Sequence, residues 1–321
     1  MNHLFEKHFE AATLNEVCAR YGINPKDTNL IKADNNLIYD CGERILRVSY
    51  SGTRTESDIE AEVNWMRFLH RQGLSVPKTI PSLAGELTER IDKPEDHFTA
   101  VLFEKIPGSK ISKATWNATH FQNLGRLTGR LHNSNEQYYQ QQPTHGIKHW
   151  DELVECSYTD LLPEDERELG QLHDQLISKF RTYEISMGTY GLIHNDIHFE
   201  NYLLMGPENK IVLFDFEVAC QSWYVYEIAT ALYYACLVNR KRNDVAFEQT
   251  FLSNFLVGYR EVRDLPPVDF EVILKFMLYR DVFLLAYRSA IWLHREMSEQ
   301  VLRHVEIVDH SIAVRRERLG W

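Results

Sequence analysis

One stretch of the chain, Leu192 to Glu217, constrains the possible fold and chemistry more than any other. It reads LIHNDIHFENYLLMGPENKIVLFDFE, with Asp196 in a polar cluster, Asn201 five positions later and Asp215 at the end of an apolar run. These gaps fit a loop, a short hairpin and a second loop. In phosphoryl transfer one Asp accepts the proton of the acceptor hydroxyl, an Asn reaches a magnesium ion, and a second Asp joins the metal to the nucleotide phosphates. The stretch therefore predicts a kinase-like site.

A second chemistry fits part of the same stretch. His194, Asp196 and His198 could bind zinc or iron, and a metal-activated water would then make the chain a hydrolase. This interpretation leaves Asn201 and Asp215 without a role, whereas hard oxygen ligands of this kind are typical of magnesium. We therefore favour phosphoryl transfer and keep the metal-dependent hydrolase as an alternative.

Composition and charge describe a soluble protein with room for two lobes. A chain of 321 residues can build two separate cores. The net charge of −11 argues weakly against nucleic acid as a partner. We expect no secretory signal, because the first residues, MNHLFEKHFE, show no basic region followed by an apolar core. We also expect no membrane span, because no apolar run approaches the roughly 18 residues that one needs.

The cysteine pattern agrees with a cytoplasmic location. The five cysteines are widely spaced and contain no CxxC pair, which favours reduced thiols over a disulfide framework or a zinc site. They are Cys18, Cys41, Cys156, Cys220 and Cys236.

Hydrophobic periodicity predicts an α+β fold with two lobes. Helical spacing runs from Leu4 to Tyr21, and strand-like segments cover 29–34, 35–40, 44–50, 85–91 and 97–106, interrupted by a helix over 55–72. We expect a small antiparallel sheet in an N-terminal lobe, 1–107, which ends at a Pro-Gly break. The larger lobe, 108–321, is expected to be mostly helical, with helices near 121–138, 169–180, 228–238, 247–259 and 270–294.

Seven segments together resemble the aminoglycoside phosphotransferase and choline kinase superfamily, which has a protein-kinase-like fold. They are ILRV at 45–48, EVNWMRFLHRQGLSVP at 62–77, VLFEKIPG at 101–108, LGRLTGRLH at 124–132, HNDIHFEN at 194–201, FDFE at 214–217 and SWYVYEIATAL at 222–232. The resemblance covers nearly the whole chain. Its last two segments are most similar to the homoserine kinase-like branch.

The resemblance implies a role for each part of the nucleotide side. Asp196 would be the catalytic base or hydroxyl-orienting group, and Asn201 and Asp215 the Mg²⁺ ligands. Arg47 falls where kinases place a phosphate-binding Lys, and Glu62 falls on the helix position that pairs with it. Arg is not a neutral replacement for Lys, and the other interpretation of Arg47 is a solvent-facing strand charge.

The resemblance also places a hinge at 103–108, between the lobes. There the carbonyl of Glu104 and the amide of Ile106 would meet the adenine of ATP. The loop Asp34-Asn35-Asn36 would lie over the phosphates, but it contains no glycine. A Gly-rich phosphate cradle is therefore absent from this loop.

An acceptor pocket is implied near the second half of the stretch. Carboxylates and aromatic rings there could bind a cationic amino alcohol by charge and cation–π contacts. The alternative is that Glu227 caps its helix and the aromatic rings pack in the core. The candidate residues are His198, Glu217, Trp223, Tyr224 and Glu227, with Tyr226 nearby, whereas His132, His145 and His149 are expected to be structural or on the surface.

Taken together, the sequence predicts an ATP- and Mg²⁺-dependent kinase for a hydroxyl group of a small, amine-bearing metabolite. Homoserine, choline, ethanolamine, an aminoglycoside and a hydroxylated amino acid all fit the catalytic set, and a protein substrate ranks below them. We expect a cytoplasmic monomer or homodimer that binds neither nucleic acid nor membrane. The alternative is a kinase-like protein that binds a ligand without transfer, which Arg47 and the glycine-free loop would favour.

Overall fold

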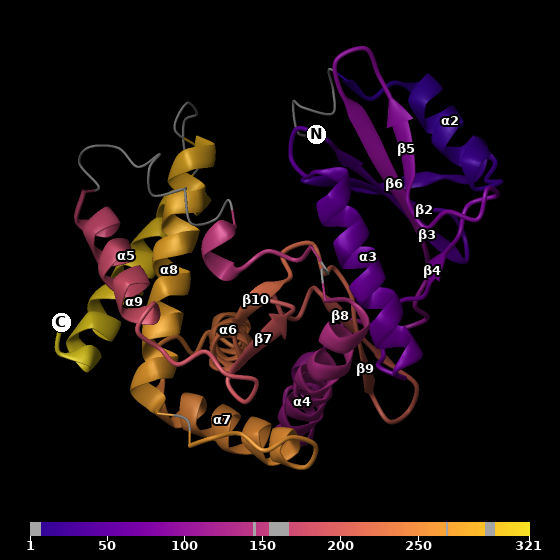
Figure 1. Ribbon diagram of the computed structural model, residues 1–321. Coiled ribbons are helices and arrows are strands. Elements are labelled where there is room, and N and C mark those ends of the chain that lie inside the picture. Colours follow the sequence, from indigo (N-terminus) through magenta and orange to yellow (C-terminus); the bar gives the residue numbers. More distant parts are fainter. Residues whose placement is uncertain (1–7, 144–145, 154–166, 268, 293–298) are drawn as a thin grey trace. The chain divides into compact units, whose positions relative to one another are not determined.

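The chain divides into two units, and neither unit is continuous in sequence. A computed structural model describes residues 8–143, 146–153, 167–267, 269–292 and 299–321 (Figure 1). The first unit comprises Met1–Ser109, Gln137–Ile147 and Leu203–Glu217, and the second comprises Lys110–Glu136, Lys148–Tyr202 and Val218–Trp321. A hinge at 103–108 stays a prediction. The predictions for Leu4, Phe5, His145, Cys156 and His294 lie outside the described residues.

The first unit is built on an antiparallel sheet, as the sequence predicts. Its strand order is β1-β2-β3-β6-β4, and β5 also pairs with β6 (Figure 1). The short β4 is not among the predicted strands, because two residues carry no readable periodicity. The strands are β1 (Asn29–Ala33), β2 (Asn36–Asp40), β3 (Arg44–Tyr50), β4 (Thr79–Ile80), β5 (Glu89–Asp92) and β6 (His97–Glu104).

Strand β3 presents opposite chemistry on its two faces. Leu46 and Val48 pack in a hydrophobic core with helix α2 (Ala11–Arg20). Because side chains alternate along a strand, Arg47 points to the other face. There it meets helix α3 (Glu56–Arg71), which begins with a capping box between Thr55 and Asp58. The sheet therefore carries an apolar core on one side and a charged pair on the other.

The hairpin of β8 (Tyr202–Met205) and β9 (Lys210–Leu213) leads to the segment Asp215-Phe216-Glu217. The amide of Leu213 donates to the carbonyl of Ser75 at 2.9 Å, which ties β9 to the chain after α3. The Phe216 ring packs edge-on against Trp65 of α3, with ring centroids 5.3 Å apart. These contacts hold the segment beside α3, the helix that carries Glu62.

The second unit combines helices with a two-stranded antiparallel sheet of β7 (Tyr190–Ile193) and β10 (Cys220–Trp223). Helix α8 packs against α5, α6 and α9 (Figure 1). Helix α9 is not among the predicted elements. The helices are α4 (Ala118–Gln141), which begins in this unit, α5 (Arg167–Phe180), α6 (Tyr224–Val238), α7 (Val245–Arg260), α8 (Phe270–Trp292) and α9 (Glu299–Leu319), and single 3₁₀ turns occur at Pro25–Asp27, Lys113–Thr115 and Trp150–Glu152.

Helices α4 and α7 approach each other at backbone distance. A side chain at Gly125 would collide with the carbonyl oxygen of Phe255, and one at Gly258 would collide with that of Gln122. Both glycines are needed because nothing larger than hydrogen fits between the two backbones. Close helix packing therefore explains Gly125, the first glycine of the LGRLTGRLH segment.

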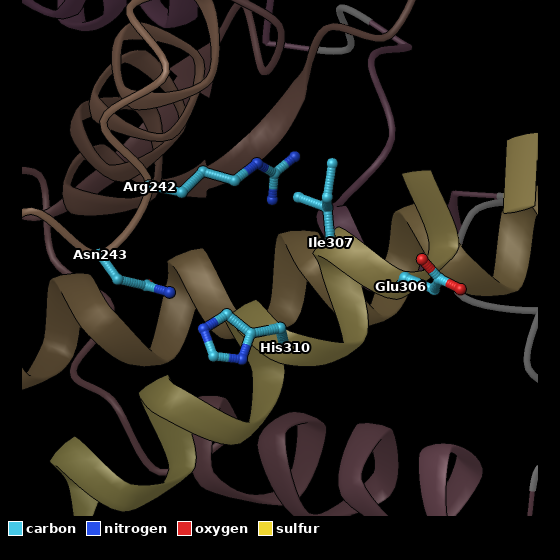
Figure 2. A pocket seen from close by; sticks show the side chains of 5 residues that line it. All are labelled: Arg242, Asn243, Glu306, Ile307 and His310. Atoms are coloured by element: carbon cyan, nitrogen blue, oxygen red, sulfur yellow. The ribbon is translucent and has the colours of Figure 1, made fainter. Parts of the chain in front are cut away.

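Helix α8 buries charged residues inside an apolar sequence. Asp281 accepts hydrogen bonds from the Tyr233 hydroxyl at 2.9 Å and from Arg242 at 3.2 Å, and it also pairs with Arg315. Arg242 lines an open pocket of about 310 Å³. Figure 2 shows its side chain together with the others that line this pocket. The other lining residues are Asn243, Glu306, Ile307 and His310. No helix among the described residues is long and apolar enough to span a membrane.

Candidate active site

The loop His194-Asn195-Asp196 leaves β7 and is fixed by Glu227 of α6. The amide of His194 donates to Oε2 of Glu227 at 2.6 Å, and the amide of Asn195 donates to Oε1 at 2.9 Å. Asn195 has a φ of 68°, a left-handed conformation that Asn tolerates better than most residues. The side chain of Asn195 also donates to the carbonyl of Val218. The loop therefore has one defined backbone path.

Glu227 itself is fully buried. Burial raises its pKa to about 8, and the charge of Asp196 acts in the same direction, while the two backbone hydrogen bonds lower it. Behind it, Nε2 of His132 lies 3.9 Å from Oε2 of Glu227, and Nδ1 of His132 is 2.8 Å from the Tyr259 hydroxyl. His132 lies in the core, in keeping with the structural role expected for it.

The carboxylate of Asp196 is held at both oxygens. Oδ2 accepts from Nδ2 of Asn201 at 3.0 Å and from Nε2 of His198 at 3.1 Å. Oδ1 accepts from Nη2 of Arg280. Burial alone would raise the pKa of Asp196, but the His198 hydrogen bond and the Arg280 charge lower it well below its ordinary value. Asp196 is therefore ionised over the whole physiological pH range.

The amide of Asn201 is oriented by its hydrogen bonds. Its Nδ2 donates to both the carbonyl and Oδ2 of Asp196, so its Oδ1 is the atom left to accept or to bind a metal. Asn201 precedes β8, and Asp215 follows β9 with a φ of 65°. An amide oxygen and a carboxylate are the hard ligands that Mg²⁺ prefers. The chemistry of this donor set fits the predicted ion.

Arg47 and Glu62 form a buried two-fold ion pair in the first unit. Nη1 and Nη2 of Arg47 lie 2.7 and 2.9 Å from the two carboxylate oxygens of Glu62, and Arg54 adds a third bond at 2.7 Å. Arg47 is only 5% exposed, so it is not a solvent-facing strand charge. Burial opposes ionisation of Glu62, but Arg47 and Arg54 lower its pKa to about 2.

The glycine-free loop is fastened to Glu217. The side chains of Asn35 and Asn36 each donate to one oxygen of the Glu217 carboxylate. Oδ1 of Asn36 accepts in turn from the Ser49 hydroxyl at 2.5 Å. Burial raises the pKa of Glu217, and Asp215 raises it further. Asparagine side chains thus define this loop where kinases usually have glycines.

The segment expected to meet adenine follows β6. The amide of Glu104 donates to the carbonyl of Lys78 and that of Lys105 to Glu43, while the carbonyl of Ile106 accepts from Gly108. These bonds fix the path of the segment. Adenine contacts by Glu104 and Ile106 stay predictions.

The candidate acceptor residues differ in their surroundings. Trp223 is buried, with its Nε1 donating to the carbonyl of Glu184, and Tyr224 is buried, with its hydroxyl accepting from Asn135. Together with the two backbone bonds of Glu227, these contacts favour the structural alternative for all three residues. His198 is different, because it touches Asp196 directly and its ring packs 4.7 Å from that of Tyr234.

The histidines of the hydrolase alternative are occupied within their own loop. Nδ1 of His194 accepts from the amide of Asp196, and Nδ1 of His198 accepts from the amide of Glu200. Among the residues that the structure describes, no three His, Cys, Asp or Glu side chains form a group suited to a metal ion. The geometry thus gives this alternative no support.

Arg280 is the site residue that sequence reasoning missed. It lies 84 positions after Asp196, on α8, and only 4% of its side chain is exposed. The available signal was a charge inside the apolar run of α8, since buried charges are rare unless they are paired. Nothing in the sequence indicates which residue is its partner.

Known proteins share both the sequence pattern and the fold. The model of the phosphotransferase enzyme family matches residues 35–265. An amicoumacin kinase of Bacillus subtilis (strain 168) is 30% identical over 282 residues, which cover 86% of this chain and 83% of that protein. A homoserine kinase of Chelativorans sp. (strain BNC1) is 26% identical over 262 residues, or 77% of this chain and 76% of that kinase.

A solved structure agrees with the sequence relatives. An amicoumacin kinase in complex with AMP-PNP, Ca²⁺ and Ami superposes with a TM-score of 0.89 at 26% identity, covering 97% of this chain and 96% of that one. The predicted family resemblance, α+β kinase-like fold and small-molecule kinase activity are therefore confirmed. The chain belongs to the phosphotransferase enzyme family and is a small-molecule kinase.

Proposed function

We propose that this protein transfers the γ-phosphoryl group of ATP, with Mg²⁺, to a hydroxyl group of a small amine-bearing compound. The observation that carries the proposal is the Asp196 carboxylate, which Asn201, His198 and Arg280 hold on a loop fixed by Glu227. Chemistry of this kind depends mostly on positioning and electrostatics.

In this proposal Asp196 orients the acceptor hydroxyl by accepting its hydrogen bond. Its lowered pKa makes it a weak base, so the proton moves to it only as the oxygen attacks phosphorus and becomes acidic. Asn201 and Asp215 would hold Mg²⁺, which when bound neutralises charge on the phosphate oxygens. The ionised Asp196 is ready to accept without a prior proton transfer.

Arg47 would contact the nucleotide phosphates, since Glu62 holds its guanidinium and the charges of Asp215 and Glu217 act on it. Glu104 and Ile106 would meet adenine through their backbone. Glu62 acts through Arg47, because it holds the guanidinium in one orientation.

The relatives suggest which acceptors to test first. Amicoumacin is the first candidate, because a kinase named for it is the 30% identical relative and another gives the TM-score of 0.89. Homoserine follows from the homoserine kinases of similar coverage. His198 is our first candidate for an acceptor contact, because it lies beside Asp196, and Glu217 is the second. We further propose that the protein is cytoplasmic and is a monomer or a homodimer.

An acceptor screen tests the proposal. ADP release should be measured with MgATP and amicoumacin, homoserine, choline, ethanolamine, an amino alcohol such as aminopropanol, and an aminoglycoside, with the phosphorylated product identified by mass spectrometry. Asp196→Ala should abolish transfer while calorimetry shows that ATP still binds. Undiminished turnover by Asp196→Ala would overturn the assignment, and ATP binding without product from any acceptor would favour a ligand-binding protein.

A further inference from the structure

Arg280 connects the middle of α8 to the candidate catalytic carboxylate. Its Nη2 donates to Oδ1 of Asp196 and, at 2.9 Å, to the Tyr234 hydroxyl. Its Nη1 lies 3.5 Å from the Tyr226 hydroxyl. The guanidinium carbon is 5.3 Å from the centre of the Tyr234 ring and 5.5 Å from that of Phe283. Aromatic rings and hydroxyls therefore hold Arg280 in one place.

Arg280 bonds to Oδ1 of Asp196, the carboxylate oxygen that Asn201 and His198 do not contact. Asn201 and His198 both bond to Oδ2, whereas Oδ1 bonds to Arg280. The Tyr234 hydroxyl also bonds to the carboxylate, and Arg280 holds that hydroxyl at 2.9 Å. The terminal torsion of an Asp side chain is broad, so donors at one oxygen alone leave the carboxylate free to pivot. Donors at both oxygens fix its plane.

A fixed plane matters because transfer depends on where the acceptor hydroxyl sits. A displacement of about 1 Å in a reacting group can lower the rate by about 10²-fold. Arg280 also offsets the negative charge of Asp196, which would otherwise repel an approaching phosphoryl group. Both effects act on the chemical step rather than on nucleotide binding.

We propose that Arg280 is a positioning residue, which holds the Asp196 carboxylate in the orientation that meets the acceptor hydroxyl. This inference rests on the proposed function, because it assigns Asp196 to the hydroxyl. Replacing Arg280 should therefore lower kcat and leave the KM for ATP unchanged.

Arg242 provides a matched control in the same unit. It is also a largely buried arginine, it pairs with a carboxylate of α8 (Asp281, at 3.2 Å), and its guanidinium lies 5.3 Å from the centre of the Tyr233 ring. Its side chain lines the pocket of Figure 2. Replacing Arg242 therefore removes the same kinds of contact without touching Asp196.

The experiment compares Arg280→Met and Arg280→Lys with Arg242→Met and Arg242→Lys. Amicoumacin is the first acceptor probe, replaced by the best acceptor of the screen if it is not turned over. Arg280→Met should lower kcat by about 10²-fold with an unchanged KM for ATP. Arg280→Lys should lose less, because it keeps the charge but not the planar fork. The Arg242 variants should lower Tm and leave kcat near that of the wild type.

Chemical rescue separates positioning from a structural role. Added guanidinium ion should restore part of kcat in Arg280→Ala and none in Arg242→Ala. Wild-type kcat in a folded Arg280→Lys or Arg280→Met protein, or equal kcat losses in the Arg280 and Arg242 series, would overturn the inference. If Asp196→Ala retains turnover, the proposed function fails. If Asp196→Ala is inactive but Arg280→Met is not impaired, only this inference fails.

Discussion

A carboxylate oxygen of Glu227 lies 2.6 Å from the backbone nitrogen of His194, so helix α6 holds the loop that carries Asp196. The other oxygen of Glu227 accepts the next amide along the chain at 2.9 Å. A residue that the sequence offered as an acceptor contact thereby becomes part of the scaffold. Under the proposed function Glu227 still affects transfer, since the backbone path of the loop determines where Asp196 can point.

Replacing Glu227 should therefore reduce both stability and turnover. Glu227→Ala leaves two buried N–H groups without acceptors, at a cost of about 1–3 kcal/mol for each group. Urea unfolding should show this loss, and kcat should fall while the KM for ATP changes little. Glu227→Gln keeps one carbonyl acceptor and should lie between Ala and the wild type. A Glu227→Ala protein as stable as the wild type would contradict this account of the loop.

The pH dependence of stability should also report on Glu227. Burial raises its pKa from 4.5 to about 8, so the folded protein binds this proton more tightly than the unfolded chain does. Its contribution to the free energy of unfolding is therefore complete below about pH 4.5 and is lost as the pH rises through about 8. The charged and titratable groups around it are Asp196, Arg280 and His132.

Urea unfolding of the wild type and Glu227→Gln at several pH values between about 5 and 9 measures this effect. The wild type should lose stability relative to Glu227→Gln as the pH rises. Parallel curves for the two proteins would show that Glu227 does not titrate in this range.

The part of the candidate site that lies within one stretch of the chain could be predicted from the spacing of its residues. Asp196, Asn201 and Asp215 lie within one stretch, and their gaps reflect a loop, a hairpin and a second loop that the structure contains. Strand β3 and helix α3 were equally accessible, because each has a clear period and α3 has a capping box. Such features depend on neighbours along the chain.

Contacts between distant segments were not readable in this way. Arg280 and Asp196 are separated by 84 positions, and only the packing of α8 brings them together. The sequence also could not decide whether Glu227 contacts the acceptor or has a structural role. That choice depends on whether its side chain is buried, which the sequence does not give. Helix α9 was missed since its sequence, EQVLRHVEIVDHSIAVRRERL, is rich in charge and has a weak apolar stripe.

The Arg47–Glu62 pair should stabilise the first unit and contribute to nucleotide binding. Glu62→Ala would leave the buried Arg47 and the partly buried Arg54 without the carboxylate that both of them bind, a change that costs about 3–5 kcal/mol. Arg47→Lys keeps the charge but loses the two-fold bond, so the KM for ATP should rise more than kcat falls. Calorimetry with ATP and thermal unfolding check both changes, and an Arg47→Lys protein with wild-type affinity for ATP would remove Arg47 from the phosphate site.

The close approach of α4 and α7 gives a final prediction that depends on packing alone. Gly125→Ala would place a methyl group against the carbonyl oxygen of Phe255, so the two helices must separate. We expect a loss of about 1–3 kcal/mol in the free energy of unfolding, as for other overpacked cores.

Gly170→Ala on α5 is the matched control, because nothing lies within 4 Å of the added carbon. There alanine has room, so the free energy of unfolding should not fall. Thermal and urea unfolding of both variants measure the difference, and equal effects at the two positions would show that α4 and α7 do not meet through their backbones.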